Sequence, residues 1–157
     1  MGQPLHWKSL LLEAVKNTKP DLPEAKQFLH RAVDGLREAG TQHNLPWALF
    51  ARATLYRYKK EFTLSWEDLE EAREIAVYGV MKLYLVDYYL EACRNVKEGL
   101  WVRDEGSGED SGKGFFIIEA GERVELSVEG MKEKFREFLR DAESLIEDIG
   151  YHRRDGE

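Results

Sequence analysis

Apolar residues recur along most of the chain at the three- to four-residue spacing of amphipathic helices, in blocks separated by Gly, Pro and Asn. Pro46 falls in the first turn of one block, where its missing N–H costs little, and Thr63 is a candidate N-cap. Gly40, Gly79 and Gly150 follow the ends of three blocks, with Gly79 predicted as a C′ residue. Short turns between helices predict antiparallel neighbours. The expected helices span residues 5–17, 22–39, 45–60, 63–78, 81–98 and 129–149.

Residues 98–129 interrupt this helical period with short β-rich runs and Gly-rich turns. The runs at 115–118 and 123–128 are separated by "EAGE" and predict a β-hairpin, and a third run covers 100–103. The stretch "EGSGEDSGKG" between the runs at 100–103 and 115–118 is typical of a mobile tip. We therefore expect an insertion, residues 99–128, placed before the last helix.

Three of the predicted helices repeat one arrangement of residues. Each carries a small or apolar residue, then Leu four positions later and Ala three positions after that, with Gly beyond. Small residues let two helix backbones approach closely, and the Leu beside them fills the remaining groove. Three copies indicate an internal repeat, in which each copy is the second helix of a pair. The copies are Ala25, Leu29, Ala32 and Gly40; Ser65, Leu69, Ala72 and Gly79; and Phe135, Leu139, Ala142 and Gly150.

The helix pair at residues 45–79 has this pattern in its most complete form and resembles the tetratricopeptide repeat (TPR) family. Ser65 follows Ala53 by 12 positions, which is the interval that the family has. In the last pair Ala92 matches the small position of the first helix, whereas Asn95 stands where the family has Tyr. The first pair matches more loosely, at Trp7, Leu10, Leu11 and Ala14. The matching positions of the central pair are Leu49, Ala53, Tyr56, Ser65, Leu69 and Ala72.

The resemblance implies an all-α fold, an α-solenoid of about three antiparallel helical hairpins within a single domain of residues 1–157. Ala32 and Ala72 are 40 residues apart, longer than the usual unit of about 34. In this the chain is similar to TPR arrays of bacterial signalling NTPases and regulators. The expected repeats cover about 5–40, 45–79, and 81–98 together with 129–150, the last interrupted by the insertion at 99–128.

The resemblance also implies a binding surface, because the first helices of TPR pairs line a concave groove. Aromatic and Arg side chains are common anchors for peptides. The alternative is that several of these residues pack between helices. Chaperone-binding members of the family present several cations to a carboxylate, and this groove has mainly aromatics, which disfavours that function. The groove positions are Trp47, Phe50, Thr54, Arg57 and Tyr58 of one helix and Val86, Tyr89, Cys93 and Lys97 of another.

Composition narrows the classes of partner. The 157 residues carry a net charge of −7, which argues against binding to nucleic acid or to an anionic membrane. Residues 98–129 hold nine acidic and three basic side chains and so carry most of that charge. Cys93 is the only cysteine and is expected in the core, and the N-terminus lacks a signal-peptide pattern. We therefore expect a cytoplasmic protein with a protein or peptide partner.

Motifs for catalysis or metal binding are weak. The four histidines are scattered, and no HExxH motif, serine elbow or dinucleotide fingerprint occurs. Acidic residues of the insertion could hold Ca²⁺ or recruit a basic partner, but their spacing is not that of an EF-hand loop, and a solvated acidic tip is the favoured explanation. "GSGEDSGKG" lacks the Gly spacing and following helix of a P-loop. The Ca²⁺ candidates are Asp104, Glu105, Glu109 and Asp110.

The sequence thus predicts a non-catalytic module, without metal or cofactor, that binds a protein or peptide segment in an aromatic-lined groove. The alternative is a self-association domain, since the ends of a short helical array expose apolar faces that a second copy can cover. An enzyme is a third hypothesis, based only on the unassigned acidic residues of the insertion.

Overall fold

The computed structural model describes residues 23–40, 43–104 and 115–155, and in this part the chain is mostly helical. Five helices are accompanied by one two-stranded antiparallel hairpin, which precedes the last helix as predicted. The expected helix at 5–17 lies outside the described residues. The elements are α2 (Pro23–Glu38), α3 (Leu45–Tyr58), α4 (Phe62–Tyr78), α5 (Lys82–Asp104), β1 (Phe115–Glu119), β2 (Glu122–Leu126) and α6 (Val128–Asp155).

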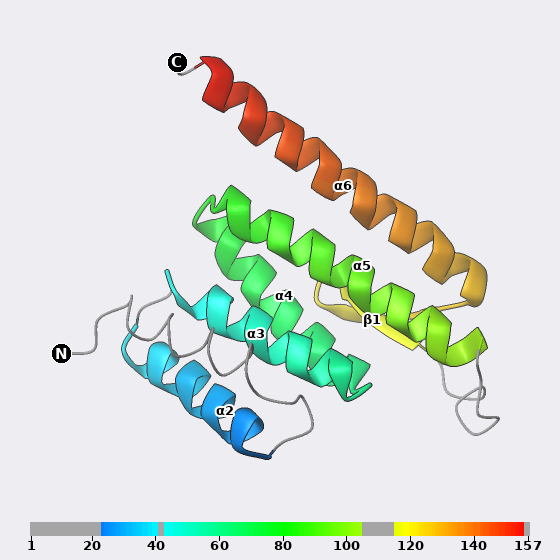
Figure 1. Ribbon diagram of the computed structural model, residues 1–157, viewed down its shortest axis with the longest axis horizontal. Coiled ribbons are helices and arrows are strands. Elements are labelled where there is room, and N and C mark those ends of the chain that lie inside the picture. The colour runs from blue at the N-terminus through cyan, green and yellow to red at the C-terminus, as the bar shows by residue number, and fades with distance from the viewer. Residues whose placement is uncertain (1–22, 41–42, 105–114, 156–157) are drawn as a thin grey trace.

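The helices follow one another in space in the order of the sequence. Each packs on the next, from α2 along one edge of the molecule to α6 along the other (Figure 1). Two further contacts join non-consecutive elements: α3 also touches α5, and the hairpin packs between α4 and α6, with β1 on α4 and β2 on α6. The hairpin therefore stands where α4 and α6 would otherwise face each other.

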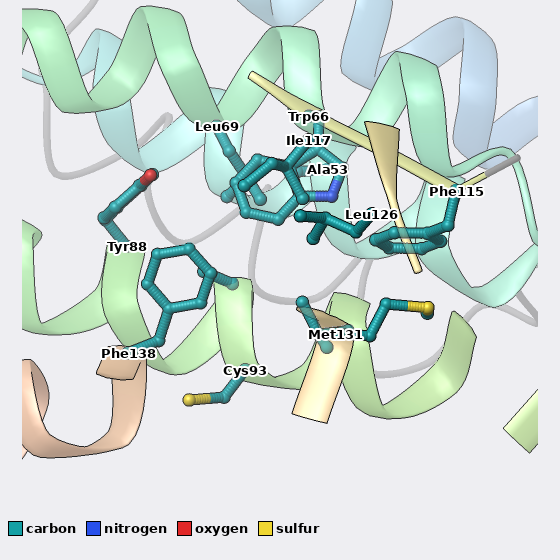
Figure 2. Close-up of a cluster of buried hydrophobic side chains, with 12 residues drawn as sticks. Ala53, Trp66, Leu69, Tyr88, Cys93, Phe115, Ile117, Leu126, Met131 and Phe138 are labelled. Atoms are coloured by element: carbon teal, nitrogen blue, oxygen red, sulfur yellow. The ribbon is translucent and has the colours of Figure 1, made fainter. Parts of the chain in front are cut away.

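The core divides into two clusters of buried side chains. One joins α2, α3 and α4 around Leu29, Val33 and Leu49. The other joins α3, α4, α5, α6 and the hairpin around Trp66 and Ile117, and Figure 2 shows Trp66, Ile117, Leu126 and Phe115 meeting there from different elements. The hairpin thus supplies part of the main core.

The residues that the repeat pattern assigned to packing are buried, with one exception. Ser65 Oγ donates a hydrogen bond to the Ala53 carbonyl (2.8 Å), so the α3–α4 pair is closely packed at its two small positions. Asn95 Nδ2 donates to Ser65 Oγ (3.0 Å), which gives this residue a buried role between α5 and α4. The exception is Leu139, which is 37% exposed. The buried residues are Ala25, Leu29, Ala32, Leu49, Ala53, Tyr56, Ser65, Leu69, Ala72, Ala92 and Ala142.

Two helices run past the glycines that follow their predicted ends. Residues 100–103 belong to α5 and not to a strand, because Gly99 lies inside that helix. A Cβ on Gly99 would collide with the Phe115 ring and lie 3.0 Å from Met131 Cε, so the residue permits close approach of the hairpin and α6. Gly150 likewise lies within α6, which extends to Asp155. Both helices are therefore longer than predicted. A glycine can either end a helix or allow close approach of a neighbouring element, and the sequence alone does not distinguish the two roles.

The helix ends around α4 also differ from the expectation. α4 begins at Phe62 after Glu61, so Thr63 is not its N-cap. At its other end Val80, with φ 53°, occupies the left-handed position expected for Gly79, whose φ is −86°. Val80 N–H bonds to the Val77 carbonyl (3.2 Å) and the next N–H to that of Ala76 (2.8 Å), which is a Schellman motif shifted by one residue from the prediction.

The predicted hairpin is present, with its strands at slightly shifted bounds. Phe115 pairs with Leu126 and Glu119 with Glu122, so the connection consists of Ala120 and Gly121. Both have positive φ, 52° and 80°, as a type I′ turn requires. Among the described helices, none is long and apolar enough to cross a membrane.

Candidate functional site

Three of the predicted groove residues on α3 contact α5. Thr54 Oγ1 donates a hydrogen bond to Glu91 (3.0 Å), and Arg57 Nε donates to the same carboxylate oxygen (2.9 Å). The rings of Phe50 and Tyr84 lie 6.2 Å apart. Arg57 and Glu91 are 6% and 3% exposed, so this ion pair is enclosed between the two helices. These side chains hold α3 against α5.

The other predicted groove residues are distributed more widely. Tyr58 is 51% exposed, with the Arg57 guanidinium 4.8 Å from its ring centre, and Lys97 is exposed on α5. Trp47 packs against the core cluster that joins α2, α3 and α4. Tyr89 is directed toward α6, where its ring lies 6.4 Å from that of Phe138. The predicted set is therefore not brought together on one surface.

A large open pocket lies instead between α4 and α6, and we call it the α4–α6 groove. Its volume is about 1040 Å³. Its walls come from α4, α6 and β1, and its floor from α5 together with Phe138 of α6. The residues that define it are Glu70, Arg73, Tyr88, Tyr89, Ile118, Lys134, Phe138 and Arg140.

Aromatic side chains form the floor of the α4–α6 groove. The rings of Tyr88 and Tyr89 are 5.2 Å apart, and that of Tyr88 meets Phe138 edge-on at 6.3 Å. Trp66 lies below, 5.9 Å from Phe138, and connects this floor to the main core. Figure 2 shows Tyr88 and Phe138 side by side, with the Tyr88 hydroxyl directed away from the cluster. The floor is thus apolar, with a polar group at its edge.

The titration of Tyr88 follows from this position. Burial raises the pKa of the Tyr88 phenol well above its usual value, the neighbouring Glu70 raises it further, and Arg73 opposes the shift. The phenol is therefore neutral at physiological pH and offers an O–H donor together with an acceptor oxygen.

Ion pairs line the walls of the α4–α6 groove. Arg73 donates two hydrogen bonds to Glu70, of 2.5 and 3.0 Å, and this bonding is the main cause of its raised pKa. Lys134 on α6 reaches Glu119 (2.5 Å) and Glu137 (3.1 Å). Burial lowers the pKa of Lys134, but these two carboxylates outweigh burial and raise it. Because most of these charges are already compensated, the walls are polar without a strong net field.

Arg140 differs from the other two cations of the groove. Arg73 and Lys134 are each engaged with a carboxylate, whereas no ion pair joins Arg140 to any residue within the described ranges. A guanidinium can bind a planar carboxylate through two parallel hydrogen bonds. Arg140 is therefore the cation of the groove that is available to a ligand.

Cys93 is buried in the main core, as predicted. Its Sγ lies 3.7 Å from the carbonyl oxygen of Phe135, between α5 and α6. Burial raises the pKa of the Cys93 thiol to about 11. The thiol is thus protonated at neutral pH and unsuited to nucleophilic catalysis, which requires a thiolate.

A second polar cluster joins α2, α3 and α4. Arg52 donates two hydrogen bonds of 2.7 Å to Asp68, and it lies 3.0 Å from Nδ1 of His30. Burial lowers the pKa of His30, and the positive charge of Arg52 lowers it further. Since a protonated His30 would face this guanidinium, the neutral ring is the favoured form. The cluster is enclosed by three helices and serves to fix their packing.

Several residues of the α4–α6 groove were not found from the sequence. Tyr89 was in the predicted list, but Arg73, Ile118 and Arg140 were not. These residues are brought together by the packing of the hairpin against α4, and helical periodicity does not encode that packing. No group of three metal-ligating side chains occurs in the described part of the chain, and the proposed Ca²⁺ ligands Glu105, Glu109 and Asp110 lie outside it.

Comparisons with known proteins do not assign the chain to a family. No family model, no curated protein and no solved structure matches it.

Proposed function

We propose that this chain is a non-catalytic protein-interaction module that binds a peptide segment of a partner protein in the α4–α6 groove. The single observation that carries the proposal is the aromatic floor of Tyr88, Tyr89 and Phe138 beneath an open volume of about 1040 Å³. Aromatic side chains supply a large contact area at modest entropic cost, which suits them to anchoring a peptide.

The polar groups of the groove suit a peptide with one apolar anchor and one acidic residue. The neutral Tyr88 phenol can donate to a peptide carbonyl, and Arg140 can bind a carboxylate. The apolar anchor would lie over Tyr89 and Ile118. Because Arg73 and Lys134 are paired with carboxylates of the chain itself, we expect apolar contact to contribute more affinity than charge.

A TPR-like solenoid is the architecture that we propose for this module. It is supported by the sequential packing of the helices and by the close contact between Ser65 and Ala53 in the central pair. In such an array the hairpin would be an insertion that separates two outer helices, α4 and α6, and so opens a groove between them. The binding surface would then lie on a different side from the α3 surface that the resemblance implies.

Two matched tyrosine variants distinguish these surfaces. Peptides that bind the intact chain would first be selected from a displayed random library, and their dissociation constants then measured for Tyr89→Ala and Tyr58→Ala. We expect Tyr89→Ala to weaken binding at least about tenfold, a change of about 1.4 kcal/mol, and Tyr58→Ala to leave it unchanged. The reverse result would place the site on α3, and a library without any binder would oppose the peptide-binding function itself.

A further inference from the structure

The outer surface of α6 has an apolar row that no described element covers. Leu139 and Ile146, seven residues apart and so on one side of the helix, are 37% and 51% exposed. The opposite flank of α6 carries Lys134 and Asp141, which line the α4–α6 groove. Within the described chain α6 packs mainly on α5, with further contacts to the hairpin and to Trp66 of α4, and Figure 1 shows it along the edge of the molecule.

This surface has the shape of a hole in a helix–helix interface. A hollow of about 570 Å³ is lined by Arg136, Leu139, Arg140 and Glu143, together with Glu133. The first four stand at positions i, i+3, i+4 and i+7, the set that surrounds an inserted side chain when two helices pack knobs-into-holes. A side chain from a second helix therefore fits beside Leu139.

The order of charges along the same surface indicates which kind of helix fits against it. Two exposed cations, Lys132 and Arg136, precede Leu139, and two exposed anions, Glu143 and Glu147, follow it; Glu133, also exposed, departs from this order. A two-fold axis between residues 139 and 140 places position 136 opposite 143 and position 132 opposite 147, and it places Glu133 opposite Ile146. Each cation then faces an anion, whereas a parallel arrangement would place like charges together.

We propose that the chain forms a symmetric dimer in which α6 pairs antiparallel with α6 of a second copy around Leu139. Leu139 of each copy enters the hollow of the other, where the aliphatic stem of Arg140 covers it. Arg136 of each copy pairs with Glu143 of the other. Arg140 stands at the edge that this hollow shares with the α4–α6 groove, whereas Tyr88, Tyr89 and Lys134 line the groove alone, so a dimer leaves the aromatic floor of each groove outside the interface.

A pair of charge reversals tests this interface. In Arg136→Glu both facing groups become anions, and in Glu143→Arg both become cations, so each variant is expected to weaken its own dimer by more than about tenfold. An equal mixture of the two restores opposite charges at both contacts and is expected to form a mixed dimer. Sedimentation velocity over a concentration series gives the dissociation constants, and native mass spectrometry identifies the mixed species.

Matched charge reversals away from α6 provide the controls. Arg31→Glu on α2 and Glu74→Arg on α4 change exposed residues by the same charge and are expected to leave the dimer intact. A wild-type chain that remains monomeric up to millimolar concentration would overturn the proposal. A dimer that is insensitive to both α6 reversals, or variants whose mixture forms no mixed dimer, would overturn it equally. Peptide binding in the groove is measured independently, so its failure is distinguishable.

Discussion

Two of the junctions between alternate helices of this protein, α3–α5 and α4–α6, are made in different ways. α3 meets α5 directly, through an enclosed ion pair between Arg57 and Glu91 that Thr54 supplements. α4 and α6 are instead separated by the hairpin, whose Ile117 is buried in the core between them. The first junction is filled by paired side chains, whereas the second leaves the α4–α6 groove above its aromatic floor.

This difference explains why the α3–α5 junction is closed and the α4–α6 junction is open. A buried ion pair constrains geometry, because both charges lose hydration and must be compensated by each other. An apolar hairpin fixes distance mainly through packing, here supplemented by the ion pairs Lys134–Glu119 and Arg123–Glu67, and leaves Arg140 at the rim available to a ligand. We therefore expect substitutions at the first junction to affect mainly stability, and substitutions at the second to affect both stability and binding.

Loss of the cation at the α3–α5 junction should have the largest effect. Arg57→Met leaves Glu91, 3% exposed, without its closest cation, and should lower the free energy of unfolding by about 3 kcal/mol or more. The double variant Arg57→Met with Glu91→Leu should recover most of this loss, because no charge is left unpaired. Urea denaturation measures both. If the double variant were no more stable than the single one, packing and not charge would hold this junction.

Shortening the hairpin's main core residue should have the next largest effect. Ile117→Ala removes a side chain that is 1% exposed and should lower the free energy of unfolding by about 3 kcal/mol. The adjacent residue is the control, because Phe116 is 38% exposed and Phe116→Ala should cost less than about 1 kcal/mol. Equal losses for the two variants, measured in urea, would show that the hairpin does not form the α4–α6 junction by burying one face.

A methyl group at Gly99 tests how closely α5 approaches the hairpin. Gly99→Ala should destabilise the fold by about 1 to 2 kcal/mol, since the added carbon meets Phe115 and Met131. In α2 the same change at Gly35, where a Cβ meets nothing within 4 Å, should stabilise by up to about 1 kcal/mol through helix propensity alone. Thermal denaturation compares the two variants. A stabilising Gly99→Ala would mean that the hairpin tolerates a wider separation.

Much of the fold could be predicted from the sequence, because the helical period of apolar residues is a local property. That period located α3 and α4 to within two residues, and the turn residues around Ala120 and Gly121 located the hairpin. The ends of α5 and α6 were wrong, because the helix predicted at 81–98 continues through Gly99 and because Gly150 was interpreted as a stop. The role of Gly99 is decided by Phe115, which is sixteen residues later and whose packing against α5 no local pattern predicts.

The candidate site was less predictable for a related reason. Tyr89 was identified as a binding residue, but its partners were expected on α3. Its neighbours in the structure, Ile118 and Arg140, come from segments whose relative position depends on how the hairpin packs against α4. Likewise, Thr54 and Arg57 have the composition of a binding surface, and only the burial of Glu91 shows that they serve the α3–α5 junction. Residue type thus indicated which side chains make contacts, and tertiary packing decided which residues they contact.

The smallest expected effect concerns the turn that shapes the hairpin. Ala120 has φ 52°, a left-handed conformation that disfavours a side chain, whereas Gly121 beside it has φ 80°. Ala120→Gly should therefore relieve strain that exceeds the entropic cost of glycine and stabilise the fold by about 0.5 kcal/mol. Gly121→Ala should destabilise it, and thermal denaturation measures both.

Because the hairpin forms only one of the two junctions, hydrogen exchange in Ala120→Gly should slow in β1 and remain unchanged in α3. Slower exchange in both elements would show that the two junctions are coupled.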